Sequence, residues 1–322
     1  MEGHFEIQLL GPPQLRWQER PFALSRRQAR ALLFRLAAES QPIPREKLAD
    51  LLWSETSPAK ARRNLTRLLS YLRGQFPHPD LLQTGGTTVS LNHGMVRSDA
   101  VLFSELCRSD DHEAWQSAVS LYRGPFLSGF ILDESREFES WQSLMGRHFE
   151  ELYLKTLRRL ILGGSDGPAQ AIGYAGLYLV VDDLAEDIHR QLITLYAQTG
   201  DRAAALRQYE ECVFVLEREL GVEPLPETRA AYEAARDGRL PALRGTNNHV
   251  LSCHKAQAQS YSNRCYRCIT AGSRRYRPSR RRHNDGRSDF RDGSGFSTRQ
   301  LHCNRHLVGL RHAGRLRHRR QK

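Results

Sequence analysis

The sequence predicts a mainly α-helical protein with short strands among its first hundred residues and a C-terminal tail that lacks a packed core. Three patterns support this prediction. Apolar and polar residues alternate near the N-terminus, as in a half-buried strand. From about residue 99 apolar residues recur every three or four positions, as on one face of a helix. Beyond residue 240 neither period is visible, and such a segment buries too little apolar surface to fold alone.

The charges follow the same three segments. Residues 1–99 hold 14 Lys+Arg and 9 Asp+Glu, residues 100–240 hold 14 and 24, and residues 241–322 hold 20 and 3. A basic N-terminal segment suits a polyanion, whereas an acidic middle segment does not. We therefore predict domains at 1–98 and 99–240, followed by a disordered basic tail at 241–322.

The chain opens with two predicted strands. Residues 5–10 and 14–18 alternate apolar and polar side chains on either side of a Gly-Pro-Pro turn at 11–13. Phe22 and Leu24 are predicted to form a third short strand.

Three helices are predicted next. Ser25 is expected to cap the first, at 26–39, and a second follows at 45–53. Ser57 and Pro58 open the third, at 58–76, because proline at the first helical position sacrifices no hydrogen bond.

The third helix has two chemically distinct faces at 100° per residue. One is a narrow apolar stripe formed by Ala61, Leu65, Leu68 and Leu72. The other is basic and polar, with Lys60, Arg63, Asn64, Arg67, Ser70 and Tyr71. Residues 81–84 and 88–91 then predict a hairpin across Gly85-Gly86, glycines able to adopt positive φ.

Strands, three helices and a hairpin, in that order, make a winged helix, whose third helix enters the DNA major groove. Asn64 has the geometry to pair with adenine, and Arg63 or Arg67 with guanine. Lys60, near the helix N-terminus, is predicted to contact phosphate, and Tyr71 shares the face. Arg26 and Arg27 either contact phosphate or only solubilise the first helix.

The middle segment reads as helices throughout. The predicted ranges are 101–108, 114–122, 137–162, 168–181, 185–198, 202–220 and 227–235. Ala171 and Ala205 lie 34 residues apart, which is the tetratricopeptide period, and Tyr196, Gly200 and Tyr209 occupy offsets typical of that repeat. We therefore predict an all-α, tetratricopeptide-like bundle.

Five stretches resemble the SARP-type activators, which join an OmpR-like winged helix to a bacterial transcriptional activator domain. They lie at 25–33, 45–53, 61–73, 121–130 and 217–224. The resemblance implies binding of double-stranded DNA at promoter direct repeats, association of two protomers and recruitment of RNA polymerase. It also implies a cytoplasmic regulator with no catalytic role and no cofactor.

Two departures from the family stand out. The hairpin tip Gly85-Gly-Thr-Thr-Val has no cation, although family wings often carry Tyr or Arg there. Larger members continue into an NTP-binding domain, but this sequence contains no G-x-x-x-x-G-K-[ST] motif. The chain thus resembles a member truncated before that domain. One hypothesis is that the tail is an out-of-frame translation of a lost NTP-binding domain. Resequencing the locus tests this, because the hypothesis requires an intact P-loop in another reading frame.

Other functions find less support in the sequence. One alternative is a zinc site formed by Cys265, Cys268, His302 and His306. However, 33 residues separate the cysteine pair from the histidine pair, so we predict no metal. No catalytic motif, apolar membrane span or signal peptide is visible. The alternative to a DNA-binding activator is a tetratricopeptide-like scaffold without specific DNA binding, which the uncharged hairpin tip and the acidic middle segment favour.

Overall fold

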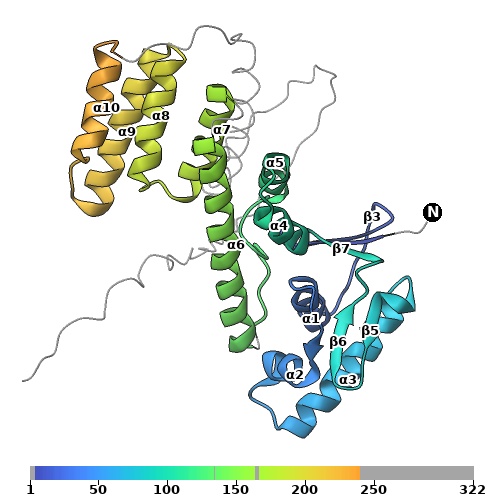
Figure 1. Ribbon diagram of the computed structural model, residues 1–322. Helices are drawn as coiled ribbons and strands as arrows, with labels where there is room; N and C mark the ends of the chain where they lie inside the picture. The colour runs from blue at the N-terminus through green and yellow to red at the C-terminus, as the bar shows by residue number, and fades with distance from the viewer. Residues whose placement is uncertain (1–3, 134, 164–166, 240–322) are drawn as a thin grey trace, which may run out of the picture. The chain divides into compact units, whose positions relative to one another are not determined.

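The computed structural model describes residues 4–133, 135–163 and 167–239, all within one compact unit. The N-terminal elements are β1 (Phe5–Gln8), β2 (Gln14–Trp17), β3 (Arg20–Pro21), α1 (Arg27–Ala37), β4 (Ile43–Pro44), α2 (Arg45–Trp53), α3 (Pro58–Gln75), the 3-10 turn η1 (Pro79–Leu81), β5 (Leu82–Thr84), β6 (Thr88–Leu91) and β7 (Val96–Ser98). Helices follow: α4 (Asp99–Arg108), α5 (His112–Leu121), α6 (Arg136–Gly163), α7 (Gly167–Val181), α8 (Glu186–Gln198), α9 (Arg202–Leu220) and α10 (Pro226–Arg236) (Figure 1). The predicted fold class is confirmed; the predicted tail at 241–322 lies outside the described residues.

Two small sheets frame the N-terminal helices. In the first, with strand order β3-β2-β1-β7, β1 runs antiparallel to β2 and parallel to β7. In the second, with order β4-β6-β5, the predicted β5–β6 hairpin is joined by β4, where Ile43 lies opposite Val89. Strands β4 and β7 have only two and three residues, which is too short for an alternation of apolar and polar side chains to be recognised in the sequence.

The third strand lies earlier than predicted. It is Arg20–Pro21, not Phe22 and Leu24, because the chain reverses at once after β2. Gln18 and Glu19 have positive φ angles of 48° and 65°, which place Arg20 opposite Trp17.

The predicted N-cap of α1 is wrong, and the predicted hairpin forms without glycines of positive φ. The N-cap of α1 is Arg26, without a side-chain hydrogen bond, and the Ser25 hydroxyl instead pairs with the Tyr71 hydroxyl at 3.1 Å. Neither Gly85 nor Gly86 is among the glycines with positive φ, so the hairpin turn does not use that freedom.

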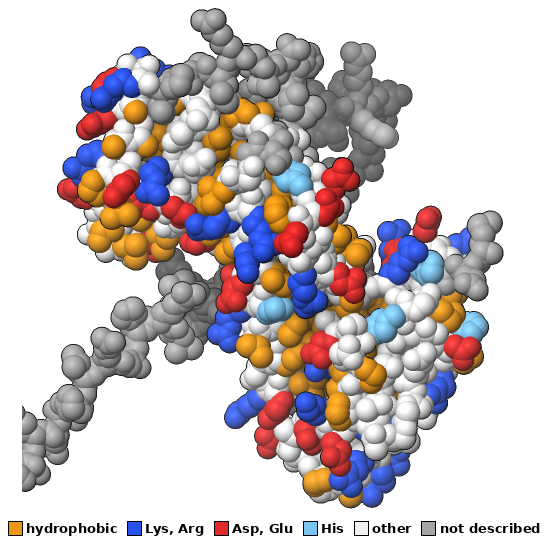
Figure 2. All heavy atoms as spheres, viewed as in Figure 1, with side chains coloured by type: hydrophobic (Ala, Val, Ile, Leu, Met, Phe, Trp, Pro, Cys, Tyr) orange, Lys and Arg blue, Asp and Glu red, His pale blue; other side chains and the backbone are white. Residues whose placement is uncertain are grey.

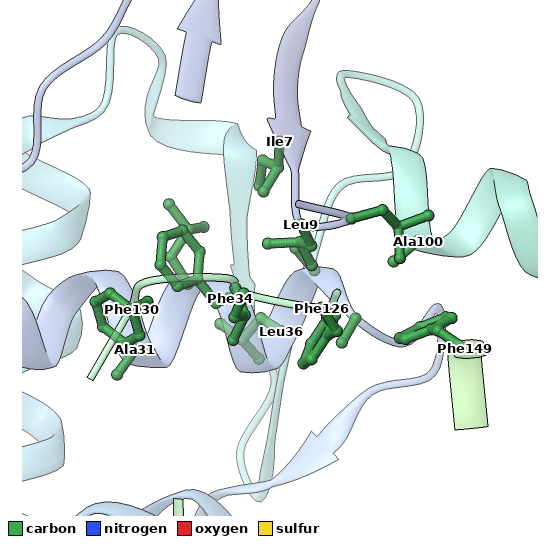
Figure 3. Close-up of a cluster of buried hydrophobic side chains, with 14 of the residues drawn as sticks. Ile7, Leu9, Ala31, Phe34, Leu36, Ala100, Phe126, Phe130 and Phe149 are labelled. Carbon is green, nitrogen blue, oxygen red and sulfur yellow. The ribbon is translucent and has the colours of Figure 1, made fainter. Parts of the chain in front are cut away.

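One apolar core runs through the N-terminal elements and on into the helices. The predicted stripe on α3 is buried, with Leu65 and Leu72 at most 1% exposed. Figure 3 shows Phe34 of α1 beside Phe126 and Phe130, which come from the segment after α5. The ring centroids of Phe34 and Phe130 lie 5.0 Å apart, and the two rings meet edge to face. Aromatic contacts of this geometry add to the stabilisation from burial alone.

The segment after α5 is also hydrogen-bonded to the end of β1. The Leu127 N–H donates to Leu9 O at 2.8 Å, and the Gly11 N–H donates to Pro125 O at 3.1 Å. Gly11 has a φ of 107°, and a Cβ at this position would lie 3.3 Å from the Arg123 Cβ. Glycine is therefore required here both for its conformation and for the close approach of the two segments.

Asp99 ties these pieces together at the first residue of α4. Its carboxylate accepts the Leu9 N–H at 2.7 Å, the Leu10 N–H at 3.1 Å and the Arg123 guanidinium at 3.2 Å. Burial raises the pKa of Asp99, although the two N–H donors and Arg123 act to lower it. The predicted boundary between residues 98 and 99 stays a prediction, and the core and these hydrogen bonds continue across it.

We expect Asp99→Ala to lower the free energy of unfolding by about 3 kcal/mol, because it leaves a half-buried guanidinium and two N–H groups without their acceptor. Chemical denaturation followed by circular dichroism measures this. The control is Asp110→Ala, an exposed carboxylate with no hydrogen bond to a described side chain. A change below about 0.5 kcal/mol for Asp99→Ala, equal to the control, would show that the carboxylate is not a structural tie.

Candidate nucleic-acid interface

Helix α3 presents three different sides. The leucine side packs into the core, and a second side contacts α2 and β5. On this second side the Arg62 guanidinium donates to the Glu46 carboxylate at 3.0 Å, and the Arg73 guanidinium donates to the Thr84 hydroxyl at 2.7 Å. These two arginines therefore have partners within the fold.

The third side of α3 bears the residues predicted to contact DNA. Lys60, Arg63 and Arg67 are exposed and Asn64 is half-buried. None of the four has a side-chain hydrogen bond or ion pair with another residue in the described part of the chain. Their N–H donors are accordingly available to a ligand.

The electrostatic field of α3 favours an anion. The helix has five Lys+Arg and no carboxylate. Its N-terminus, next to Lys60, is the positive end of the helix dipole, with Pro58 in the first turn. A polyanion lying along the third side would therefore meet cations over several turns.

Tyr71 joins the start of α1 to this surface. The Arg26 guanidinium lies 4.0 Å from the centre of the Tyr71 ring, and the hydroxyls of Tyr71 and Ser25 are 3.1 Å apart. Guanidinium stacking on an aromatic face leaves the N–H edges open for hydrogen bonds. Arg26 thus lies beside the α3 residues.

Arg27 is directed elsewhere. Its guanidinium forms an ion pair at 2.8 Å with Asp133, in the segment before α6, and both side chains are more than half exposed. Exposed pairs of this kind contribute at most about 1 kcal/mol. Arg27 is therefore separated from the predicted DNA-binding group, but held only weakly.

The β5–β6 hairpin contributes no positive charge at its tip. Its turn residues are Gly85, Gly86 and Thr87, and the Thr87 carbonyl accepts the Arg45 N–H at 2.9 Å. The absence of a cation noted in the sequence thus applies to the folded hairpin as well.

The sequence pattern places the α3 residues correctly on one face, but it missed the contacts between elements. Ser25–Tyr71 and Arg27–Asp133 join residues 46 and 106 positions apart. Periodicity along one helix holds no information about such distant partners. Whether these residues contact DNA is a separate matter that the fold alone leaves as a prediction.

The helical region forms a stack of paired helices. Ala171 and Ala205 are at most 4% exposed, Gly200 makes the α8–α9 turn with a φ of 81°, and the Tyr209 and Tyr232 rings stack at 4.2 Å. These features match the predicted tetratricopeptide-like packing.

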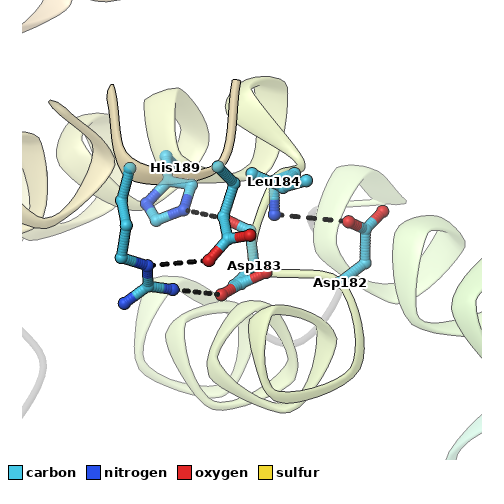
Figure 4. Close-up of polar contacts among 6 residues, drawn as sticks. Asp182, Asp183, Leu184 and His189 are labelled. Carbon is cyan, nitrogen blue, oxygen red and sulfur yellow. Dashed lines mark hydrogen bonds and ion pairs between the residues drawn. The ribbon is translucent and has the colours of Figure 1, made fainter. Parts of the chain in front are cut away.

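A polar network lies at the α7–α8 turn. The buried His189 ring bonds to Asp183 O at 3.0 Å and to the Gln208 side chain at 2.8 Å. Figure 4 shows His189 directed at the turn of Asp182, Asp183 and Leu184. Both ring nitrogens are satisfied, which indicates a structural role.

Other chemistry finds little geometric basis in the described residues. Burial raises the pKa of the Cys107 thiol, and raises that of Cys212 to about 12, so neither is a thiolate at neutral pH. No group of three or more His, Cys, Asp or Glu residues that could hold a metal occurs in the described ranges. The cysteines and histidines of the alternative zinc site lie outside these ranges.

Among the described helices, none combines the length and apolar character needed to cross a membrane.

Comparison with known proteins identifies the helical domain and similar regulators. The model of the bacterial transcriptional activator domain matches residues 105–236. The transcriptional regulatory protein MoaR1 of Mycobacterium tuberculosis is 26% identical over 254 residues, covering 71% of this chain and 78% of that protein. MoaR1 of Mycobacterium bovis is 25% identical over 258 residues, with the same two coverages. Residues 105–236 therefore match a bacterial transcriptional activator domain, and the chain is similar to two transcriptional regulatory proteins.

A solved structure supports the fold. Mycobacterium tuberculosis EmbR, in complex with a low affinity phosphopeptide, matches 83% of this chain and 72% of its own, with a TM-score of 0.55 and 20% identity. At that identity the likeness concerns the fold alone.

If Arg27 contacts phosphate as predicted, its ion pair with Asp133 opposes that contact, and Asp133→Asn should strengthen non-specific DNA binding. The slope of log affinity against log salt should steepen by up to about one unit, the effect of one added phosphate contact. Fluorescence anisotropy with a random duplex at several salt concentrations measures it. Asp110→Asn, which changes the net charge equally, is the control; identical slopes for the two variants would assign the effect to net charge alone.

Proposed function

We propose that this regulator binds DNA in a sequence-specific manner by inserting α3 into the major groove. The observation that supports this most directly is the division of the cations on α3. Arg62 and Arg73 are paired within the fold, whereas Lys60, Arg63 and Arg67 are not paired with any described residue. Exposed, unpaired cations on the one helix side that faces away from the protein suit a polyanionic ligand.

Some side chains on this face are suited to contact bases, and others are suited to contact phosphates. Asn64 offers the amide that pairs with adenine, and Arg63 and Arg67 offer the guanidinium fork that pairs with guanine. Lys60, at the positive end of the helix, suits a phosphate. Arg26, stacked on Tyr71, is placed to reach a phosphate beside the same groove, while Arg27 would first have to leave Asp133.

The regulator is further proposed to act as a homodimer on promoter direct repeats in the cytoplasm, recruiting RNA polymerase as an activator. This part rests on the family. The bacterial transcriptional activator domain at residues 105–236 is the part of the chain to which we assign association and recruitment.

A protein-interaction scaffold is the second candidate. One observation favours it: the hairpin tip has no cation, and Arg27 is engaged by Asp133, so two of the expected DNA contacts are missing. The two candidates differ in sequence specificity rather than in fold.

Selection of bound genomic fragments with the full chain tests the first candidate. We expect the wild type to enrich a repeated motif and the Arg63→Ala/Arg67→Ala double variant to enrich none, because each bidentate base contact contributes about 1–3 kcal/mol of discrimination.

The matched control is Arg20→Ala/Arg147→Ala, which removes the same charge from two exposed arginines outside α3. It should enrich the same motif as the wild type. Absence of any motif with folded wild-type protein would reject specific DNA binding and favour the scaffold.

A further inference from the structure

The end of α9 and the loop that follows it expose an unusual number of large apolar side chains. Phe214 is 58% exposed, Leu220 56%, Val222 49% and Leu225 52%. Nine large hydrophobic residues are this exposed in the described part of the chain, and four of them fall within these twelve positions. Clustered exposure of this kind marks an interaction surface more often than isolated exposed residues do.

These four side chains lie within one stretch of the chain, the C-terminal half of α9 and the loop after it, which we call the α9–α10 surface. On α9, Glu210, Phe214 and Glu217 are spaced three or four residues apart and so share one outer face. Leu220 ends the helix, and Val222 and Leu225 extend the surface through the loop to α10. Figure 2 shows apolar side chains gathered at the end of the α9–α10 pair, beside acidic ones.

The surface is held in a fixed conformation. Gly221 caps α9 with a φ of 68°, and its N–H donates to Glu217 O at 3.0 Å. The Leu225 N–H donates to the Glu186 carboxylate at 2.6 Å, which ties the loop to the start of α8. Since Pro224 between them is buried, the loop is anchored while its apolar side chains remain outside.

The charge around the surface limits what can bind it. Residues 210–227 contain six Glu and one Arg. DNA is excluded by repulsion, and so is a symmetric contact with a second copy, because identical patches would bring the carboxylates of both together. A partner with Lys or Arg around an apolar centre has the complementary charge.

A cation already occupies part of the surface. The Arg218 guanidinium lies 5.1 Å from the centre of the Phe214 ring, and it also pairs with Glu219 at 2.7 Å. The chain thus places an arginine over an exposed ring and next to a carboxylate. A partner's arginine or lysine would pair in the same way with the carboxylates of Glu210 and Glu217, which have no ion pair with a described residue.

We propose that the α9–α10 surface binds a basic amphipathic helix of another protein. Apolar side chains of that helix cover Phe214, Leu220, Val222 and Leu225, and its flanking Lys or Arg residues meet the surrounding carboxylates. The contact uses none of the α3 residues and is independent of the proposed DNA binding.

A fluorescein-labelled 18-residue Leu/Lys peptide, designed as an amphipathic helix, tests this with the full chain by fluorescence anisotropy. Phe214→Gln/Leu220→Gln should weaken its binding at least about tenfold, because truncating central apolar anchors has large effects. Glu210→Gln/Glu217→Gln should weaken it and flatten its salt dependence. A Leu/Glu peptide of the same pattern should not bind.

The matched control is Leu162→Gln/Val180→Gln, which alters two apolar side chains that are equally exposed on α6 and α7. It should bind like the wild type, as should Arg63→Ala/Arg67→Ala, which separates this result from the test of DNA binding. Thermal unfolding confirms that each variant is folded. No binding, equal loss in the control, or a dimer that becomes a monomer in Phe214→Gln/Leu220→Gln by light scattering would overturn the proposal.

Discussion

The carboxylate of Asp99 is the contact on which the organisation of this chain depends. It accepts hydrogen bonds from the end of β1 and from Arg123, and it begins α4. Because a buried charge is tolerated only with such partners, three segments distant in sequence are held at one point. The glycine at position 11 lets the segment after α5 lie against β1, and Phe126 and Phe130 then complete the core around Phe34. The family motif at 121–130 is thus mainly a packing element.

The Lys and Arg side chains at the N-terminal surface fall into two groups, those with hydrogen-bond or ion-pair partners within the fold and those without. Arg62 and Arg73, on the second side of α3, are paired with α2 and β5, and Arg27 is paired with Asp133. Lys60, Arg63 and Arg67 are left without described partners. Net charge alone would not distinguish these groups. The local arrangement of acceptors is what concentrates unsatisfied donors on one helix face, and this supports the proposal that the chain binds DNA.

Features with a strong local pattern could be predicted from the sequence. The leucine stripe and the basic face of α3 follow from the period of a helix, and α9 begins and ends where its apolar repeat does. Two- and three-residue strands such as β4 and β7 could not be predicted, since pairing defines them rather than alternation. Ser25 shows the same limit: a sequence suited to an N-cap places its hydroxyl on Tyr71, an interaction set by the packing of α1 on α3. For the candidate site, the basic face of α3 could be predicted from the sequence, but its contacts with residues of other elements could not.

The stacking of Arg26 on Tyr71 has a consequence for how this regulator can evolve. A residue at the beginning of α1 and one on the third helix depend on each other for orientation. Replacing Tyr71 would release Arg26 as well, so one substitution would alter two of the residues that we propose as DNA contacts. Changes of specificity that preserve affinity are therefore easier at Asn64 or Arg67, which have no such coupling to described residues. The geometry separates positions free to diverge among related regulators from positions that must change in pairs.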